Sequence, residues 1–218
     1  MSSIGPIYCE TPVGAFLFPA EPINFYSNAI IVLFGLVALA YAVKRRFSAD
    51  ISVLALLLAL TGVGSFLWHG FRTPLSLALD VVPGLLFLFL FVYAWSRRVY
   101  GVLASLGLLV GFLGLTYALS FVSESVLPMQ GPPLGVVLAV LISAGYLSVL
   151  SIQRFGSVGY VAILSVISSL IAFGFRTLDL YTCTVIPFGT HFLWHVFLSL
   201  GAALGVLFLM LVDSSRKL

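Results

Sequence analysis

Long apolar stretches dominate this sequence and determine the solvent in which it can fold. Polar or proline-containing breaks separate them into seven runs of about twenty residues. A helix that crosses a bilayer needs about this length, because each residue advances roughly 1.5 Å through a hydrocarbon core of about 30 Å. We therefore expect an all-α, polytopic membrane protein with seven transmembrane helices, near residues 23–43, 51–70, 75–95, 100–121, 133–152, 157–175 and 187–212.

The composition excludes a water-soluble fold. Hydrophobic residues make up 61% of the 218 residues and charged residues only 8%, against about 25% charged in an average soluble domain. The formal charge of +3 marks membrane topology and does not indicate nucleic-acid binding. We expect a single domain over residues 1–218. It comprises an outer N-terminal segment (1–22), a helical bundle (23–212) and a cytoplasmic tail (213–218).

The basic residues predict the orientation in the membrane. With seven spans, eight of the ten fall on one side: Lys44, Arg45, Arg46, Arg97, Arg98, Arg154, Arg216 and Lys217. Arg72 and Arg176 fall on the other side. Short loops rich in Lys and Arg stay in the cytoplasm, so the N-terminus is predicted outside or in a lumen and the C-terminus in the cytoplasm. A bacterial cell membrane and an endoplasmic-reticulum or Golgi membrane both fit.

The chain has two cysteines, Cys9 and Cys183, and both lie on the predicted outer side. This side is the oxidising one, where a disulfide persists. Pairing cannot be deduced from the residues alone, and two free thiols are the alternative.

Ionisable residues converge near the outer boundary. His69 ends the second span, whereas His191 and His195 are four residues apart at the start of the seventh and share one helix face. Asp80 lies early in the third span, and Ser65 is one turn before His69. Each residue alone has a structural explanation, such as an interfacial histidine or a serine bonded to its own helix. Together they predict a functional site, because ionisable groups are costly within a membrane.

Three neutral imidazoles with an open fourth position are typical of catalytic zinc. Zinc makes its bound water acidic enough to ionise near pH 7. Asp80 is then a candidate base and Ser65 a candidate oxyanion donor. This combination predicts hydrolysis of an amide or ester, and its place in the membrane makes the substrate a lipid.

Other classes of seven-helix protein fit less well. A retinal-binding pump needs a lysine within a span, and Lys44 and Lys217 both lie at span ends. A transporter needs ionisable groups past the bilayer midplane, which the spans lack. A non-catalytic receptor with a structural zinc and a hydrolase of another lipid amide or ester both remain as alternatives.

The order of these residues resembles the alkaline ceramidases, which belong to a superfamily of seven-helix hydrolases that includes adiponectin-receptor-type proteins. The resemblance covers the chain from Tyr8 through the last span and rests on these motifs: Tyr8-Cys9-Glu10, Glu21-x2-Asn24-x2-Ser27-Asn28, Gly64-Ser65-x3-His69-x10-Asp80 and Cys183-x7-His191-x3-His195. It implies a zinc amidase that cleaves ceramide to a sphingoid base and a fatty acid. It also implies zinc ligation by the three histidines, water activation by Asp80, oxyanion stabilisation by Ser65 and a disulfide between Cys9 and Cys183.

The resemblance also implies a calcium site, with Glu10 and Glu21 as candidate ligands. Ile7 and Pro12, however, stand where the family has an aspartate and an asparagine. Calcium takes six to eight oxygen ligands. Strong calcium dependence is therefore not expected, and the alternative is that both glutamates are ordinary interfacial carboxylates.

Overall fold

The structure is a computed structural model, and it describes residues 5–14, 17–126 and 134–215. Every regular element in these ranges is helical, which confirms the all-α prediction. The elements in chain order are α1 (Pro22–Ser27), α2 (Ala29–Lys44), α3 (Ala49–Phe71), α4 (Pro74–Tyr100), α5 (Val102–Val126), α6 (Leu134–Phe155), the short 3-10 helix η1 (Gly156–Val158), α7 (Gly159–Thr182) and α8 (His191–Ser215).

Six stretches in the described ranges are helical, long and apolar enough to cross a membrane. One of them, Val137–Thr182, is 46 residues long, because η1 joins α6 to α7 without a polar break. The chain therefore has the helices of an integral membrane protein. The count of seven crossings and their orientation stay predictions.

Several helix ends differ from the expected spans. The first span is two helices that meet at Asn28, so α1 is a separate short element. Helix α7, which corresponds to the sixth expected span (157–175), continues to Thr182, seven residues beyond the expected end. The last helix, α8, begins at His191 and continues to Ser215, so part of the expected tail is helical; residues 216–218 lie outside the described ranges.

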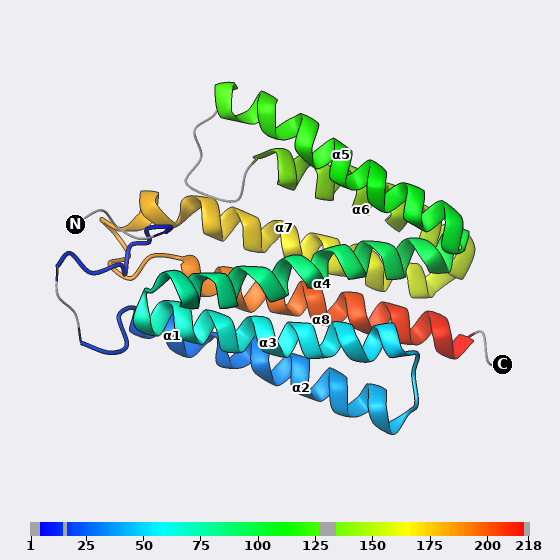
Figure 1. Cartoon of the computed structure of the whole chain (residues 1–218), viewed down its shortest axis with the longest axis horizontal. Helices are drawn as coiled ribbons and strands as arrows, with labels where there is room; N and C mark the ends of the chain where they lie inside the picture. The colour runs from blue at the N-terminus through cyan, green and yellow to red at the C-terminus, as the bar shows by residue number, and fades with distance from the viewer. Residues whose placement is uncertain (1–4, 15–16, 127–133, 216–218) are drawn as a thin grey trace.

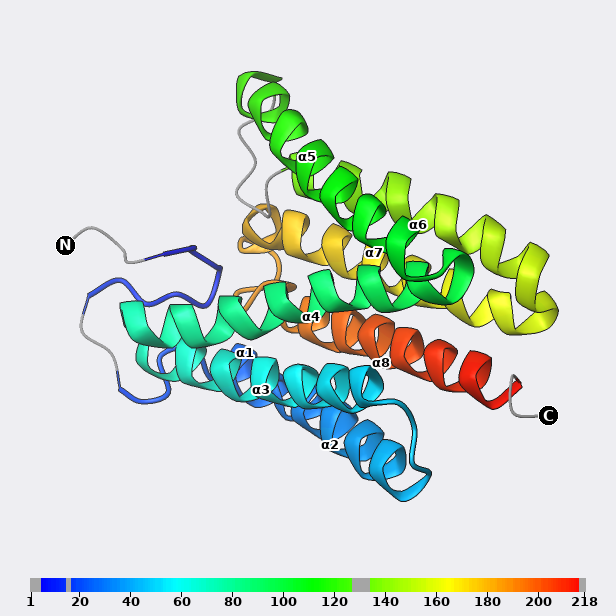
Figure 2. The same cartoon turned by 45° about the vertical axis from the view of Figure 1, so that its right-hand side comes forward.

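The helices run along the long axis of the molecule, with the N-terminal segment at one end and the end of α8 at the other (Figure 1). The α5–α6 pair lies to one side and diverges from the other helices toward the N-terminal end in both views (Figures 1 and 2). In the most apolar stretch of α3 and of α8, 50% of the residues are buried. In the corresponding stretches of the other spans, this share is 11–28%. The two helices that carry the histidines are therefore also the most enclosed.

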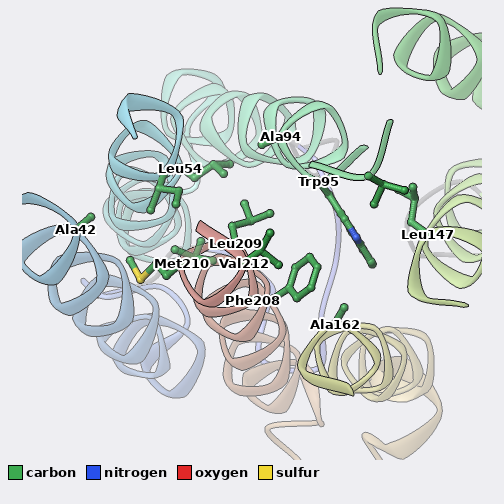
Figure 3. Close-up of a cluster of buried hydrophobic side chains, with 13 residues drawn as sticks. Ala42, Leu54, Ala94, Trp95, Leu147, Ala162, Phe208, Leu209, Met210 and Val212 are labelled. Carbon is green, nitrogen blue, oxygen red and sulfur yellow. The ribbon is translucent and has the colours of Figure 1, made fainter. Parts of the chain in front are cut away.

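The hydrophobic core occupies the end of the bundle opposite the N-terminal segment. Phe208, Leu209 and Val212 of α8 lie at its centre, and Trp95 of α4 and Leu54 of α3 pack against them (Figure 3). All five of these side chains are almost fully buried. This packing holds α8 against α3 and α4.

An ion cluster around the buried Arg98 joins the same three helices at this end, and its two carboxylates are partly buried. The Arg98 guanidinium of α4 is 2.8 Å from the Asp50 carboxylate of α3 and 2.7 Å from the Asp213 carboxylate of α8. Removing one partner of such a cluster would leave a charge buried without compensation. The cluster therefore holds α3, α4 and α8 in register with one another, and their other ends carry the candidate site.

Candidate metal centre

The three histidines come together at the end of the bundle that holds the N-terminal segment. His69 lies in the last turn of α3, and His191 and His195 lie in the first two turns of α8. Each is at most 2% exposed, and one ring nitrogen from each lies within 4.8 Å of the others. The predicted convergence is thus present, and the cluster could hold a metal ion.

The Nδ1 atoms of two histidines are bound by neighbouring side chains. His69 Nδ1 is hydrogen-bonded to the Glu21 carboxylate, and His195 Nδ1 is 2.6 Å from the Ser27 hydroxyl. Outer partners of this kind orient histidine ligands and fix their tautomer, which leaves Nε2 to face a metal. His191 Nδ1 is buried and has no hydrogen-bond partner among the described residues.

Glu21 connects the histidine cluster to the N-terminal segment. Its carboxylate is fully buried, accepts a hydrogen bond of 2.6 Å from the Thr11 hydroxyl and lies 3.2 Å from the Arg72 guanidinium. Burial raises the pKa of Glu21, whereas the Thr11 bond and the Arg72 charge act in the opposite direction. Backbone N–H groups of residues 20 and 21 donate to the carbonyls of Gly70 and His69, so the segment runs along the end of α3.

The two candidate calcium ligands already have protein partners. Glu10 accepts hydrogen bonds from the backbone N–H groups of Ile23 and Asn24, at 2.7 and 2.8 Å, and so anchors the start of α1. Burial raises the pKa of Glu10 and these two donors lower it. Calcium binding by Glu10 and Glu21 stays a prediction, and calcium would have to compete with these donors.

Ser65 and Asp80 are brought together by a close approach of α3 and α4. A Cβ on Gly64 would lie 1.9 Å from the Leu79 carbonyl oxygen and 2.7 Å from the Asp80 nitrogen, so only glycine fits there. The Ser65 hydroxyl is buried and interacts with the partly buried Asp80 carboxylate. Asp80 does not form an ion pair with Arg72, which pairs with Glu21 instead.

The disulfide between Cys9 and Cys183 is present, and it ties the N-terminal segment to the chain that follows α7. Next to it, the Tyr8 ring stacks on His191 with 3.9 Å between ring centroids. Burial raises the pKa of Tyr8 to about 12, so its hydroxyl stays neutral at physiological pH. Tyr8 therefore covers one side of the histidine cluster with an uncharged ring.

Asp179 is a site residue that the sequence did not reveal. One of its carboxylate oxygens accepts the N–H groups of Thr190 and His191, at 2.7 and 2.8 Å, and the other accepts that of Cys9 at 3.0 Å. Gly189, with φ of +68°, makes this possible because a Cβ there would lie 2.1 Å from the Asp179 carboxylate. Asp179 thus fixes the start of α8. The one sequence feature that relates Asp179 to the site is its position twelve residues before His191. The expected helix ended at 175, so Asp179 was expected to lie in a loop.

Charged groups lie close to the cluster on more than one side. Glu21 is bonded to His69, Asp179 accepts the backbone N–H of His191, and Arg72 and Arg176 both interact electrostatically with His69. Three buried imidazoles in such surroundings fit a metal of the zinc type by donor chemistry.

Comparison with known proteins supports the same interpretation. The sequence model of one protein family, Ceramidase, matches residues 7–218, which is nearly the whole chain. We find no match to this chain among curated proteins. The matched range contains all three histidines together with Ser65 and Asp80. The chain therefore belongs to the ceramidase family.

Proposed function

We propose that this protein is a zinc-dependent lipid amidase that hydrolyses the amide bond of ceramides to a sphingoid base and a free fatty acid. The supporting observation is a buried cluster of three histidines at one end of an apolar helix bundle, in a chain of the ceramidase family. The family match supports a hydrolase that acts on amide bonds. The zinc, the residue roles and the exact substrate form the proposal.

His69, His191 and His195 would hold the zinc through one nitrogen each. With Nδ1 of His69 and of His195 engaged by Glu21 and Ser27, Nε2 is the nitrogen available on both rings. Three protein ligands leave a fourth position for substrate or water, as in catalytic zinc sites. A bound zinc would supply Lewis acidity, which makes water a nucleophile at neutral pH and polarises a carbonyl.

Asp80 and Ser65 would carry the proton transfers and the charge stabilisation. Asp80 accepts a proton from the attacking water and returns it to the amide nitrogen as the C–N bond breaks. The Ser65 hydroxyl donates a hydrogen bond to the carbonyl oxygen as negative charge develops there. Ser65 and Asp80 interact where α3 and α4 approach each other closely at Gly64. This interaction supports both roles, because it keeps the donor and the base together on neighbouring helices.

We also propose that the chain crosses the membrane seven times, with the histidine cluster near the outer or lumenal leaflet. The disulfide lies at the same end as the cluster, and disulfides persist on the oxidising side of a membrane. The single domain predicted for residues 1–218 agrees with a family match that spans residues 7–218. The single-domain proposal is also supported by Asp179, whose carboxylate accepts the N–H groups of both Cys9 in the N-terminal segment and His191 in α8.

Release of fatty acid from ceramides of graded acyl length, by detergent-purified protein, tests the proposal. We expect hydrolysis that a zinc chelator abolishes and added zinc restores. Asp80→Asn should retain zinc and lose about 10²-fold or more in turnover, the usual scale for a general base. Ser65→Ala should lose about 10²-fold, whereas Ser105→Ala, the same change at a buried serine of α5, should not.

The outcomes separate the parts of the proposal. No cleavage of any ceramide by zinc-loaded protein would refute the substrate, and the matched ester lipids would then identify a different hydrolase. Full turnover in Asp80→Asn would refute the role of Asp80 alone. Loss of zinc in that variant would instead make Asp80 a ligand or a structural residue.

A further inference from the structure

Arg176 of α7 carries a buried charge that forms no ion pair with any carboxylate of the described residues. The residue is only 7% exposed, and its Nη1 atom has no hydrogen-bond partner among the described residues. The Tyr8 ring packs against it, with its centroid 4.6 Å from the guanidinium carbon. The described residues contain no carboxylate in ion-pair distance of this guanidinium.

Two other arginines, whose side chains are also largely enclosed, differ from Arg176 because each forms an ion pair. Arg72 lies 3.2 Å from the Glu21 carboxylate, and Arg98 is paired with carboxylates on two other helices. A buried charge is strongly unfavourable unless it is paired. Arg176 departs from the pattern of its own protein, and a departure of this kind is expected at a binding site.

None of the neighbouring carboxylates among the described residues forms an ion pair with Arg176. Asp179, one turn further along α7, uses both oxygens for three backbone N–H groups. Glu21 is taken by His69, Thr11 and Arg72. Asp80 is near enough to interact electrostatically with Arg176 without forming an ion pair. Among the described residues, no carboxylate is therefore paired with Arg176, and an anion from outside the chain would complete its surroundings.

The position of Arg176 indicates which anion it would meet. Tyr8 contacts both the guanidinium of Arg176 and the imidazole of His191, so one aromatic ring joins the two. Arg176 also interacts electrostatically with all three histidines. A ligand that reaches the histidine cluster thus comes under the influence of this charge.

The proposed reaction makes one new anion. Water adds its oxygen to the acyl carbon, the C–N bond breaks and both protons of the water pass to the nitrogen, so that a neutral amide becomes a carboxylate and an ammonium group. A guanidinium binds a carboxylate through two parallel hydrogen bonds. We propose, on the basis of the function proposed above, that Arg176 binds the carboxylate of the released fatty acid. Free fatty acids are then ligands and inhibitors of this protein.

Binding of two probes with the same chain and different head groups tests this inference. Palmitate and hexadecanol are titrated into the detergent-purified protein, and their affinities are compared in four chains: the wild type, Arg176→Gln, Arg176→Lys and Arg45→Gln. Arg45 is exposed at the opposite end of the bundle and serves as the matched control. Zinc content and melting temperature, measured for each variant, show whether the histidine cluster is intact.

We expect the wild type and Arg45→Gln to prefer palmitate by about tenfold or more, which corresponds to about 1.4 kcal/mol. Arg176→Gln should lose most of this preference with its zinc content unchanged, and Arg176→Lys should be intermediate because it keeps the charge and loses the planar fork. If Arg176→Gln does not fold, the result for Arg176→Lys decides: a preference equal to that of the wild type overturns the inference. A folded Arg176→Gln with the wild-type preference also overturns it, as does a wild type without any preference.

The inference and the proposed function fail in distinguishable ways. Ceramide hydrolysis without an Arg176-dependent preference for palmitate would overturn the inference and leave the amidase proposal intact. An Arg176-dependent preference in a protein that hydrolyses no ceramide would support the inference and refute the amidase proposal.

Discussion

Replacing Glu21 with glutamine tests whether the N-terminal segment controls metal binding. The Glu21 carboxylate is fully buried and has His69, Arg72 and Thr11 as neighbours. A glutamine side chain has nearly the same shape, but it has only one acceptor oxygen. Either the imidazole of His69 or the guanidinium of Arg72 would therefore face an amide N–H group in place of an acceptor.

The size of the effect follows from these contacts. A buried donor that loses its acceptor costs about 1–3 kcal/mol. Removing an outer partner of a histidine ligand usually lowers metal affinity by about 10–100-fold, which corresponds to roughly 1.4–2.8 kcal/mol. The two estimates agree, so we expect Glu21→Gln to bind zinc about 10–100-fold more weakly.

Competition with a zinc chelator of known affinity measures this change in detergent-purified protein. Glu10→Gln is the matched control, because Glu10 lies in the same segment and bonds to the backbone of α1 without touching a histidine. We expect the control to bind zinc as the wild type does. Unchanged zinc affinity in Glu21→Gln, or an equal loss in Glu10→Gln, would refute the reasoning.

Three further substitutions test how the site is built. Gly64→Ala should separate α3 from α4, because overpacking there costs about 1–3 kcal/mol, and should thereby lower both the melting temperature and ceramide turnover. Gly111→Ala, where a Cβ meets open space, should change neither the melting temperature nor turnover. Asp179→Ala should leave three N–H groups, two of them buried, without their acceptor, so zinc content should fall in metal analysis; full zinc content would contradict its role. Cys9→Ser should remove the bond to Cys183 and lower stability by about 2–4 kcal/mol in thermal unfolding, an effect absent if the wild type is already reduced.

The sequence contained enough to predict the helices and the histidine cluster, for physical reasons. The length of each apolar run is set by the bilayer, and helices of alternating direction bring His69 close to His191 without any knowledge of side-chain packing. Ser65 and Asp80 followed from the same counting. These features depend on spacing along the chain, which the sequence displays directly.

The contacts around the histidines could not be predicted because they depend on irregular backbone. Arg72 follows the end of α3 and has a left-handed backbone conformation, and from there its side chain reaches Glu21. Backbone hydrogen bonds hold the N-terminal segment against the same end of α3. Asp179 appeared to lie in a loop, since polar residues near a helix end give no clear boundary. The partners of a buried polar group depend on such loop positions, which hydrophobic periodicity does not report.

Metal analysis of the purified wild type and of His195→Ala tests the central claim most directly. His195 is buried, belongs to the three-histidine cluster and has its Nδ1 held by Ser27. The account predicts about one zinc ion per wild-type chain, and no zinc and no ceramide hydrolysis in His195→Ala. A wild type that hydrolyses ceramide without zinc, or a His195→Ala variant that keeps both its zinc and its turnover, would contradict it.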